Sequence, residues 1–128
     1  MNKRIQYIQH QGREIIFLDY SNLEEEEYLQ AIKETEEKVL AHSNNPQKNL
    51  NLVDVTGSPT TAAVIGAASK LIAKIGSRDL LVALIGISGM KKVVARAFSK
   101  NYYFANSVEE AKDWLVKEAE IRDKKNII

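Results

Sequence analysis

Two apolar runs, each followed by a polar loop and a helical pattern, constrain the fold of this chain most strongly. The first covers residues 50–55 and continues into a Thr-Gly-Ser-Pro loop, and the second covers residues 80–87 and continues into a Ser-Gly loop. Predominantly apolar runs of this length are typical of strands that are buried on both faces of a parallel sheet. We therefore expect an α/β protein in which strand ends lead through polar loops into helices.

The segments around these two runs extend the alternation of strands and helices. Residues 5–8 and 14–20 flank a His-Gln-Gly-Arg turn and predict a β-hairpin, with residues 15–18 covered on both faces. Periodic apolar residues predict helices at 24–42, 64–75, 90–98 and from 108 onward, and an aromatic segment at 101–105 predicts a last strand. The predicted fold is α/β, with a mixed, mostly parallel sheet of four to five strands and about four helices in the order ββαβαβαβα.

Two segments have the Ser-x-x-Glu spacing of a capping box, in which a serine side chain and a glutamate side chain satisfy the backbone at a helix start. Ser21 with Glu24 predicts the start of the first helix, and Ser107 with Glu110 predicts the start of the last one.

Length and composition limit the organisation of the chain. Residues 1–128 are expected to form a single domain, with 120–128 as a frayed tail. The chain has no cysteine, which excludes a disulfide framework, a thiolate nucleophile and cysteine-ligated zinc. We find no signal-peptide pattern, and the longest apolar run has about 8 residues where a membrane span needs roughly 20. A cytoplasmic protein without a membrane span is expected.

Charge is distributed unevenly along the chain. Residues 1–60 contain 6 Lys and Arg against 10 Asp and Glu, whereas residues 61–128 contain 12 against 7. The basic half is explained either by solvent faces of helices or by an anionic partner. Nucleic acid is not the expected partner, because no exposed-looking aromatic residues lie among the bases at 70–100.

The candidate binding site consists of the two loops that follow the apolar runs. If the two strands are parallel neighbours, their loops lie side by side at one end of the sheet. Free backbone N–H groups at a helix start, with a lysine nearby, can bind phosphate or carboxylate groups. The candidate binding residues are Asp54, Thr56, Gly57, Ser58, Ser88, Gly89, Lys91 and Lys92.

Other interpretations of these residues remain open. Ser88 can act as a helix cap, and Asp54 can bond to nearby backbone N–H groups in a turn. Asp19 ends the second predicted strand and, if that strand is adjacent, approaches Asp54, so the two carboxylates could do acid–base chemistry. Neither P-loop nor dinucleotide-binding glycine motif occurs. No catalytic residue, metal site or cofactor is expected.

Four segments, in this order, resemble the SpoIIAA-like branch of the STAS superfamily, also described as STAS/SEC14-like. They are Leu-Asp-Tyr-Ser at 18–21, Asp-Val-Thr-Gly at 54–57, Gly-Ile-Ser-Gly-Met-Lys-Lys at 86–92 and Glu-Glu-Ala-Lys-Asp-Trp-Leu at 109–115. The resemblance implies a sheet of four to five strands with helices mainly on one side. It also implies a regulatory or ligand-binding role, and SEC14-like relatives hold lipids.

The resemblance also concerns phosphorylation. Anti-sigma-factor antagonists of this superfamily carry Asp-Ser-[Ser/Thr]-Gly in the corresponding loop, and a partner kinase phosphorylates the first serine. Here Asp54, Thr56 and Gly57 match the pattern, but Val55 occupies the serine position and cannot accept phosphate. The standard serine switch is therefore not expected, and Thr56 and Ser58 are the candidate phosphorylation sites.

These observations predict a non-enzymatic regulatory module that binds a protein partner or a small anionic or lipidic ligand at loops 54–58 and 86–92. The alternative is a small enzyme that acts on a phosphorylated or carboxylated metabolite, with Asp54 or Asp19 as the base. The sequence leaves open whether the chain forms a homodimer.

Overall fold

A mixed five-stranded sheet forms the centre of the protein. The computed structural model describes residues 4–42, 50–59, 61–75, 81–86 and 102–126. The strands are β1 (Ile5–His10), β2 (Arg13–Asp19), β3 (Leu50–Asp54), β4 (Leu81–Ile85) and β5 (Tyr102–Ala105). They lie in the order β1-β2-β3-β4-β5, with β1 antiparallel to β2 and all later neighbours parallel.

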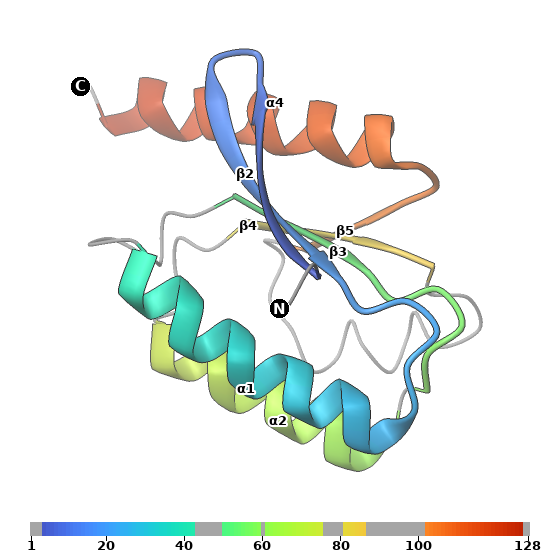
Figure 1. Cartoon of the computed structure of the whole chain (residues 1–128). Helices are drawn as coiled ribbons and strands as arrows, with labels where there is room; N and C mark the ends of the chain where they lie inside the picture. Colours follow the sequence, from blue (N-terminus) through green and yellow to red (C-terminus); the bar gives the residue numbers. More distant parts are fainter. Residues whose placement is uncertain (1–3, 43–49, 60, 76–80, 87–101, 127–128) are drawn as a thin grey trace.

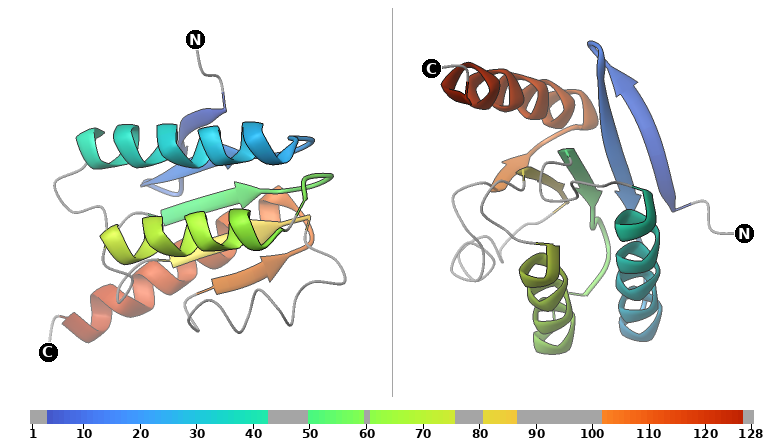
Figure 2. Two further views of the ribbon diagram at one scale, coloured as in Figure 1. Left: turned by 90° about the horizontal axis from the view of Figure 1, so that it is seen from below. Right: turned by 90° about the vertical axis from the view of Figure 1, so that its left-hand side faces the viewer.

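Three helices in the described residues cover the two faces of this sheet. Helices α1 (Glu25–His42) and α2 (Ala62–Ile75) lie next to each other on one face, and α4 (Val108–Asn126) lies across the other (Figures 1 and 2). Since β2, β3 and β4 are parallel neighbours, right-handed crossovers place α1 and α2 on the same face. Helix α4 follows the last strand and covers the opposite face.

The predicted α/β class and mixed, mostly parallel sheet are confirmed. The helix predicted at 90–98, which would make four, lies outside the described residues. None of the described helices is both long and apolar enough to cross a membrane.

Two apolar clusters hold the layers together. One lies between the sheet and α1 with α2, and includes Ile16 and Leu18; the other lies between the sheet and α4, and includes Ile15 and Leu115. Ile15 and Ile16 are 0% and 2% exposed although their side chains point to opposite faces. The prediction that residues 15–18 are covered on both faces is confirmed, and it explains why this segment is apolar without alternation.

The predicted hairpin is confirmed. Two residues with positive φ, Gln11 (51°) and Gly12 (81°), connect β1 to β2, and His10 pairs with Arg13. Positive φ at both central positions is the type I′ geometry, which matches the twist of the paired strands.

The two Ser-x-x-Glu segments differ in how they relate to the helices that follow them. Ser107 Oγ accepts a hydrogen bond from the Glu110 N–H (3.1 Å), as predicted. At α1 the predicted box is wrong, because Glu24 is the capping position and its N–H donates to Glu27 Oε1 (3.0 Å). Ser21 instead bonds to Asp19, two residues earlier in the chain.

The prediction of a frayed tail at 120–128 is wrong for residues 120–126, and residues 127–128 lie outside the described part of the chain. Helix α4 continues to Asn126. Ala119 is buried against the sheet, and Asp123 forms an ion pair with Arg13 of β2 (Nη2–Oδ2, 2.5 Å). Residues 120–126 are therefore helical although most of them are polar, and Asp123 contacts a hairpin that is far away in the sequence.

A pair of substitutions in α4 tests the packing. Leu115 is 0% exposed and Ile121 is 39% exposed on the same helix. Leu115→Ala should lower the free energy of unfolding by about 2–5 kcal/mol, because it leaves a cavity under the sheet. Ile121→Ala should change it by less than about 1 kcal/mol. Urea unfolding of both variants measures the difference, and similar losses would contradict this packing.

Two buried tyrosines at the start of α1 provide a pH-dependent test. The Tyr20 hydroxyl bonds to the buried Thr35 hydroxyl, and the Tyr20 and Tyr28 rings lie 5.2 Å apart. Burial raises the pKa of Tyr28 from 10.0 to about 12, and burial likewise raises the pKa of Tyr20.

Because folding favours the neutral form of both tyrosines, their contribution to stability is complete below pH 10. It should be lost as the pH rises through 10 towards 12. Ultraviolet titration of the folded chain should show late-ionising tyrosines, one fewer in Tyr28→Phe. Ionisation of every tyrosine in one step near the ordinary pKa would contradict the buried positions.

Candidate functional site

The carboxyl ends of β2 and β3 carry two turns of the same construction. Asp19 Oδ1 accepts hydrogen bonds from the N–H (3.0 Å) and hydroxyl (2.5 Å) of Ser21. Asp54 Oδ1 accepts the same pair from Thr56, at 3.0 Å and 2.6 Å. These are Asx turns, in which a short carboxylate side chain holds the backbone two residues further on.

Asp19 and Asp54 are register partners in the parallel β2–β3 pair, so the expected approach of these two strand ends is confirmed. Their neighbouring turns also reveal a repeat that the sequence analysis missed. The pattern Asp-x-[Ser/Thr]-[Asn/Gly] occurs at 19–22 and again at 54–57. Ser21 and Asn22 therefore belong to the site, and this repeat was the signal that could have identified them.

Backbone hydrogen bonding continues between the strands after they end. The Tyr20 N–H donates to Asp54 O and the Asn22 N–H donates to Thr56 O, both at 2.8 Å. On the other side, the Val55 N–H donates to Ile85 O at 2.9 Å. The loops after β2 and β3 consequently run side by side at one end of the sheet (Figure 1). We call residues 19–23, 54–58 and Gly86 the strand-end surface.

Ser58 joins the two loops to the start of α1. Its hydroxyl donates to Tyr20 O and accepts a hydrogen bond from the Leu23 N–H (2.8 Å). Leu23 is buried, so the hydroxyl satisfies a backbone donor that water does not readily reach. Ser58 thus has a structural role in addition to the binding role predicted for it.

Close approach of the loops requires two glycines. Gly57 (φ 76°) and Gly86 (φ 89°) both occupy the left-handed region. A Cβ on Gly57 would lie 2.3 Å from the side-chain Oδ1 of Asn22. A Cβ on Gly86 would lie 2.6 Å from the backbone N and Cα of Thr56, which cannot move without moving the loop.

Arg4, immediately before β1, supports the first of these loops from the side. Its Nη1 donates to Asp19 O (3.0 Å) and Ser21 O (3.3 Å), and lies 3.8 Å from Asp19 Oδ1. The guanidinium therefore offsets the negative charge of the Asp19 side chain and donates hydrogen bonds to carbonyl groups at and just after the end of β2.

The structure brings together half of the predicted site residues. Asp54, Thr56, Gly57 and Ser58 form one loop, in which Thr56 and Gly57 are exposed. The other candidates, Ser88, Gly89, Lys91 and Lys92, lie outside the described residues.

The chemistry available in the described residues is that of a hydrogen-bonding surface. No group of three or more His, Asp or Glu side chains within these residues is arranged to hold a metal ion. His10 pairs with Asp113 of α4 (Nε2–Oδ1, 3.0 Å) beside the hairpin turn. The length of β2 places that turn roughly 20 Å from Asp19, so His10 cannot relay a proton to the aspartates.

Comparisons of this chain with protein-family models, with curated proteins and with solved structures give no match.

Three glycines with similar φ but different surroundings test the construction of the strand-end surface. A Cβ added at Gly12 (φ 81°) would have no atom within 4 Å, whereas one at Gly57 would meet a side chain and one at Gly86 would meet backbone. Substitution by alanine should cost about 1–2 kcal/mol at Gly12 from the left-handed conformation alone. The cost should be larger at Gly57 and largest at Gly86.

Chemical denaturation of the three alanine variants measures this order. Equal losses at the three positions would contradict the close approach of the loops, because the conformational cost is common to all of them.

Proposed function

We propose that this chain is a non-enzymatic, STAS-like regulatory module that binds a protein partner, or a small anionic or lipidic ligand, through its strand-end surface. The observation that carries the proposal is the hydrogen-bonded pair of Asp-x-[Ser/Thr] turns at neighbouring strand ends. Such a surface is ordered before binding, so little conformational entropy is lost when a partner docks on it.

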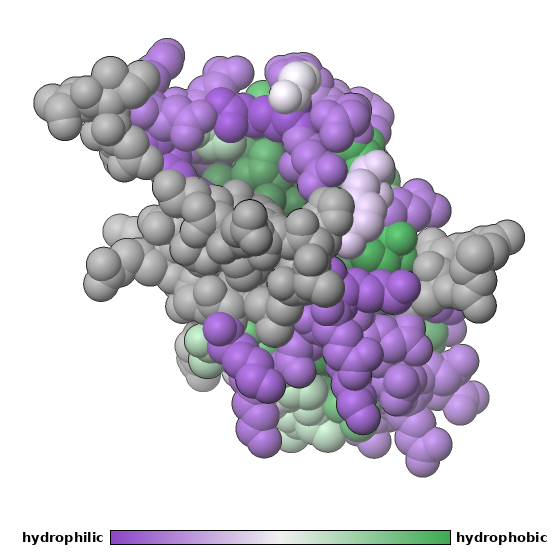
Figure 3. Space-filling model, turned by 60° about the vertical axis from the view of Figure 1, so that its left-hand side comes forward, coloured by the Kyte–Doolittle hydropathy of each residue, from purple (hydrophilic) through white to green (hydrophobic). Residues whose placement is uncertain are grey.

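The exposed groups of the surface suit recognition by hydrogen bonding. Asn22, Thr56, Gly57 and Gly86 are exposed, and Ser21 and Asp54 are half-buried. Figure 3 is seen from the other side of the molecule, where the described residues are mostly hydrophilic with smaller hydrophobic areas. A polar partner surface fits these loops better than an apolar one. The proposed anionic-ligand role of Ser88, Lys91 and Lys92 rests on their sequence pattern.

Thr56 is the better of the two candidate phosphorylation sites. It is exposed, and its hydroxyl bonds to Asp54, whereas the Ser58 hydroxyl is engaged with two backbone groups of the neighbouring loop. A phosphate on Thr56 would stand beside the Asp54 carboxylate and open the turn by repulsion. Modification at Thr56 would therefore switch the surface off.

The alternative is an enzyme that uses Asp19 or Asp54 as a base, and their register pairing favours it. Against it, Oδ1 of each aspartate already accepts two hydrogen bonds from its own turn, and the bonds of Asp54 are at the surface. Oδ1 of each aspartate is therefore committed to its turn, which leaves only Oδ2 to accept a substrate proton.

Loop substitution tests the proposal. Immobilised wild-type chain should retain a specific protein from a lysate of its source cells, or gain thermal stability with phosphorylated metabolites or anionic lipid vesicles. Thr56→Arg should abolish that response, because the long side chain covers the surface. Lys33→Ala, at an exposed position on α1, should leave it unchanged.

Circular dichroism of each variant controls for folding. A response that is identical in the wild type and both variants, or no response to any of these probes, would contradict binding at the strand-end surface. Turnover of a metabolite that is lost in Asp54→Asn would instead establish the enzyme.

A further inference from the structure

A small hollow lies between the amino-terminal ends of β2 and β3 and the last part of α4. Its volume is about 280 Å³, and it is lined by Arg13, Glu14, Leu50, Ala119, Arg122 and Asp123. Arg13 and Leu50 are the first residues of their strands, whereas the strand-end surface lies where the same strands end. The seven residues of β2 separate the two places by roughly 20 Å. The hollow is therefore distinct from the strand-end surface.

Two arginines and one aspartate supply the charged side chains on this face of the sheet. Arg13 lies on the same face as Ile15, which packs under α4, and it pairs with Asp123 (Nη2–Oδ2, 2.5 Å). The Glu14 side chain lies on the opposite face, since successive side chains of a strand alternate. On that face burial, and then the nearby Glu14 carboxylate, raise the pKa of Tyr7. Two cations against one anion leave the hollow with a single positive charge in excess.

Arg122 carries this excess charge. Asp123 is engaged by Arg13, and Arg122 forms no ion pair within the part of the chain that the structure describes. Its side chain is half-buried where it lines the hollow. A guanidinium group presents its donors as a planar fork that matches the two oxygens of a carboxylate. An anion in the hollow would therefore pair with Arg122.

The charge and the size of the hollow select the class of ligand. A carboxylate carries one negative charge, whereas a phosphate monoester carries nearly two at neutral pH and would lie close to the Asp123 carboxylate. Leu50 and Ala119 are each 5% exposed and form an apolar floor. The volume of about 280 Å³ equals that of roughly nine water molecules in the liquid, so a ligand with a similar number of non-hydrogen atoms fits.

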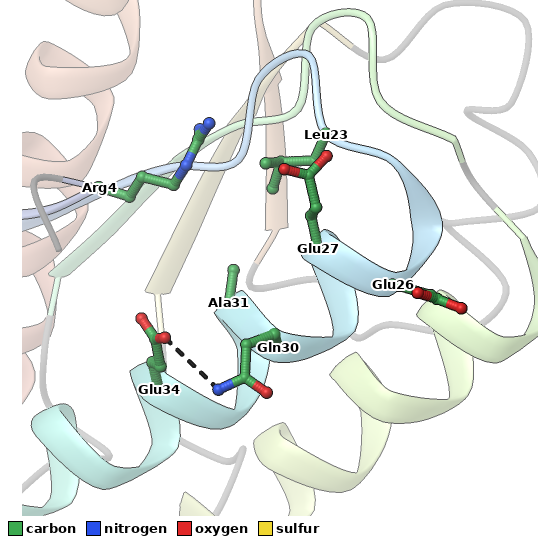
Figure 4. Close-up of a pocket in the computed structure, with 7 residues that line it drawn as sticks. All are labelled: Arg4, Leu23, Glu26, Glu27, Gln30, Ala31 and Glu34. Carbon is green, nitrogen blue, oxygen red and sulfur yellow. Dashed lines mark hydrogen bonds between the residues drawn. The ribbon is translucent and has the colours of Figure 1, made fainter.

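A larger hollow, of about 540 Å³, lies beside Arg4 and α1 (Figure 4). Glu26, Glu27 and Glu34 line it together with that one arginine, so negative charge is in excess there. Because like charges repel, a carboxylate would be disfavoured in the larger hollow and favoured in the one at α4. Charge rather than volume therefore decides which hollow an acidic ligand enters.

We propose that the hollow beside Arg122 binds a small monocarboxylate with a short apolar chain. The carboxylate pairs with the Arg122 guanidinium, and the apolar chain lies against Leu50 and Ala119. Asp123 sets the preference for a single negative charge, because it already neutralises Arg13. This site does not depend on binding at the strand-end surface.

Titration with hexanoate, which is of about the required size, tests the proposal through the amide NMR resonances of the full chain. Hexanoate should shift the resonances of Leu50, Ala119 and Arg122 in a saturable manner at millimolar concentrations. Hexanol has the same chain without charge, and hexylammonium has the same chain with a positive charge. Both should bind at least about tenfold more weakly, because neither can pair with the guanidinium.

Two substitutions that remove the same charge test the role of Arg122. Arg122→Gln should weaken hexanoate binding roughly tenfold, because it removes the pairing group. Lys124→Gln removes a charge from an exposed position on α4 that does not line the hollow, so it should change binding by less than about twofold. Asp123→Asn should allow inorganic phosphate to compete with hexanoate, since Arg13 is then no longer neutralised.

Four results would overturn the proposal. They are the absence of a saturable shift with hexanoate at these residues, binding of hexanol as tight as that of hexanoate, equal effects of Arg122→Gln and Lys124→Gln, and failure of phosphate to compete in Asp123→Asn.

Discussion

The hydrogen bonds that continue between β2, β3 and β4 after the strands end are the interaction on which the rest of the structure depends. Parallel strands are joined by crossover connections that carry the chain over one face of the sheet. Here the loops remain paired for several residues, through Tyr20, Asn22 and Val55, and Ser58 ties them to the start of α1. These hydrogen bonds therefore determine both the direction in which α1 begins and the position of the strand-end surface.

Much of this fold could be predicted, because strands that are buried on both faces have nearly continuous apolar sequences. Such strands were indicated by the apolar sequences of β3 and β4, and by the continuous apolar run that includes Ile15 and Ile16. The hairpin was equally predictable, because Gly12 supplies the positive φ that its turn requires. Features that depend on a distant partner were not predictable. Ion pairing between Arg13 and Asp123 joins residues 110 positions apart, and nothing local to the tail indicates it.

The candidate site was likewise predictable only in part. The loop at Asp54 could be predicted from the apolar strand that leads into it. Ser21 and Asn22 were missed because a Ser-x-x-Glu spacing fits a helix cap equally well. The Asp-x-[Ser/Thr] repeat was the signal in the sequence, and the hydrogen bonds within the two turns together with the β2–β3 register show that Asp19 and Asp54 build matching turns side by side.

Amide hydrogen exchange at the strand-end surface tests the central claim most directly. If the loops are an extension of the sheet, the N–H groups of Tyr20, Asn22 and Val55 should exchange together, at rates comparable to those of the adjoining residues in β2 and β3. The Leu23 N–H should be protected in the wild type and should exchange faster in Ser58→Ala. Exchange of Tyr20, Asn22 and Val55 at the rates of unstructured loops would contradict the account.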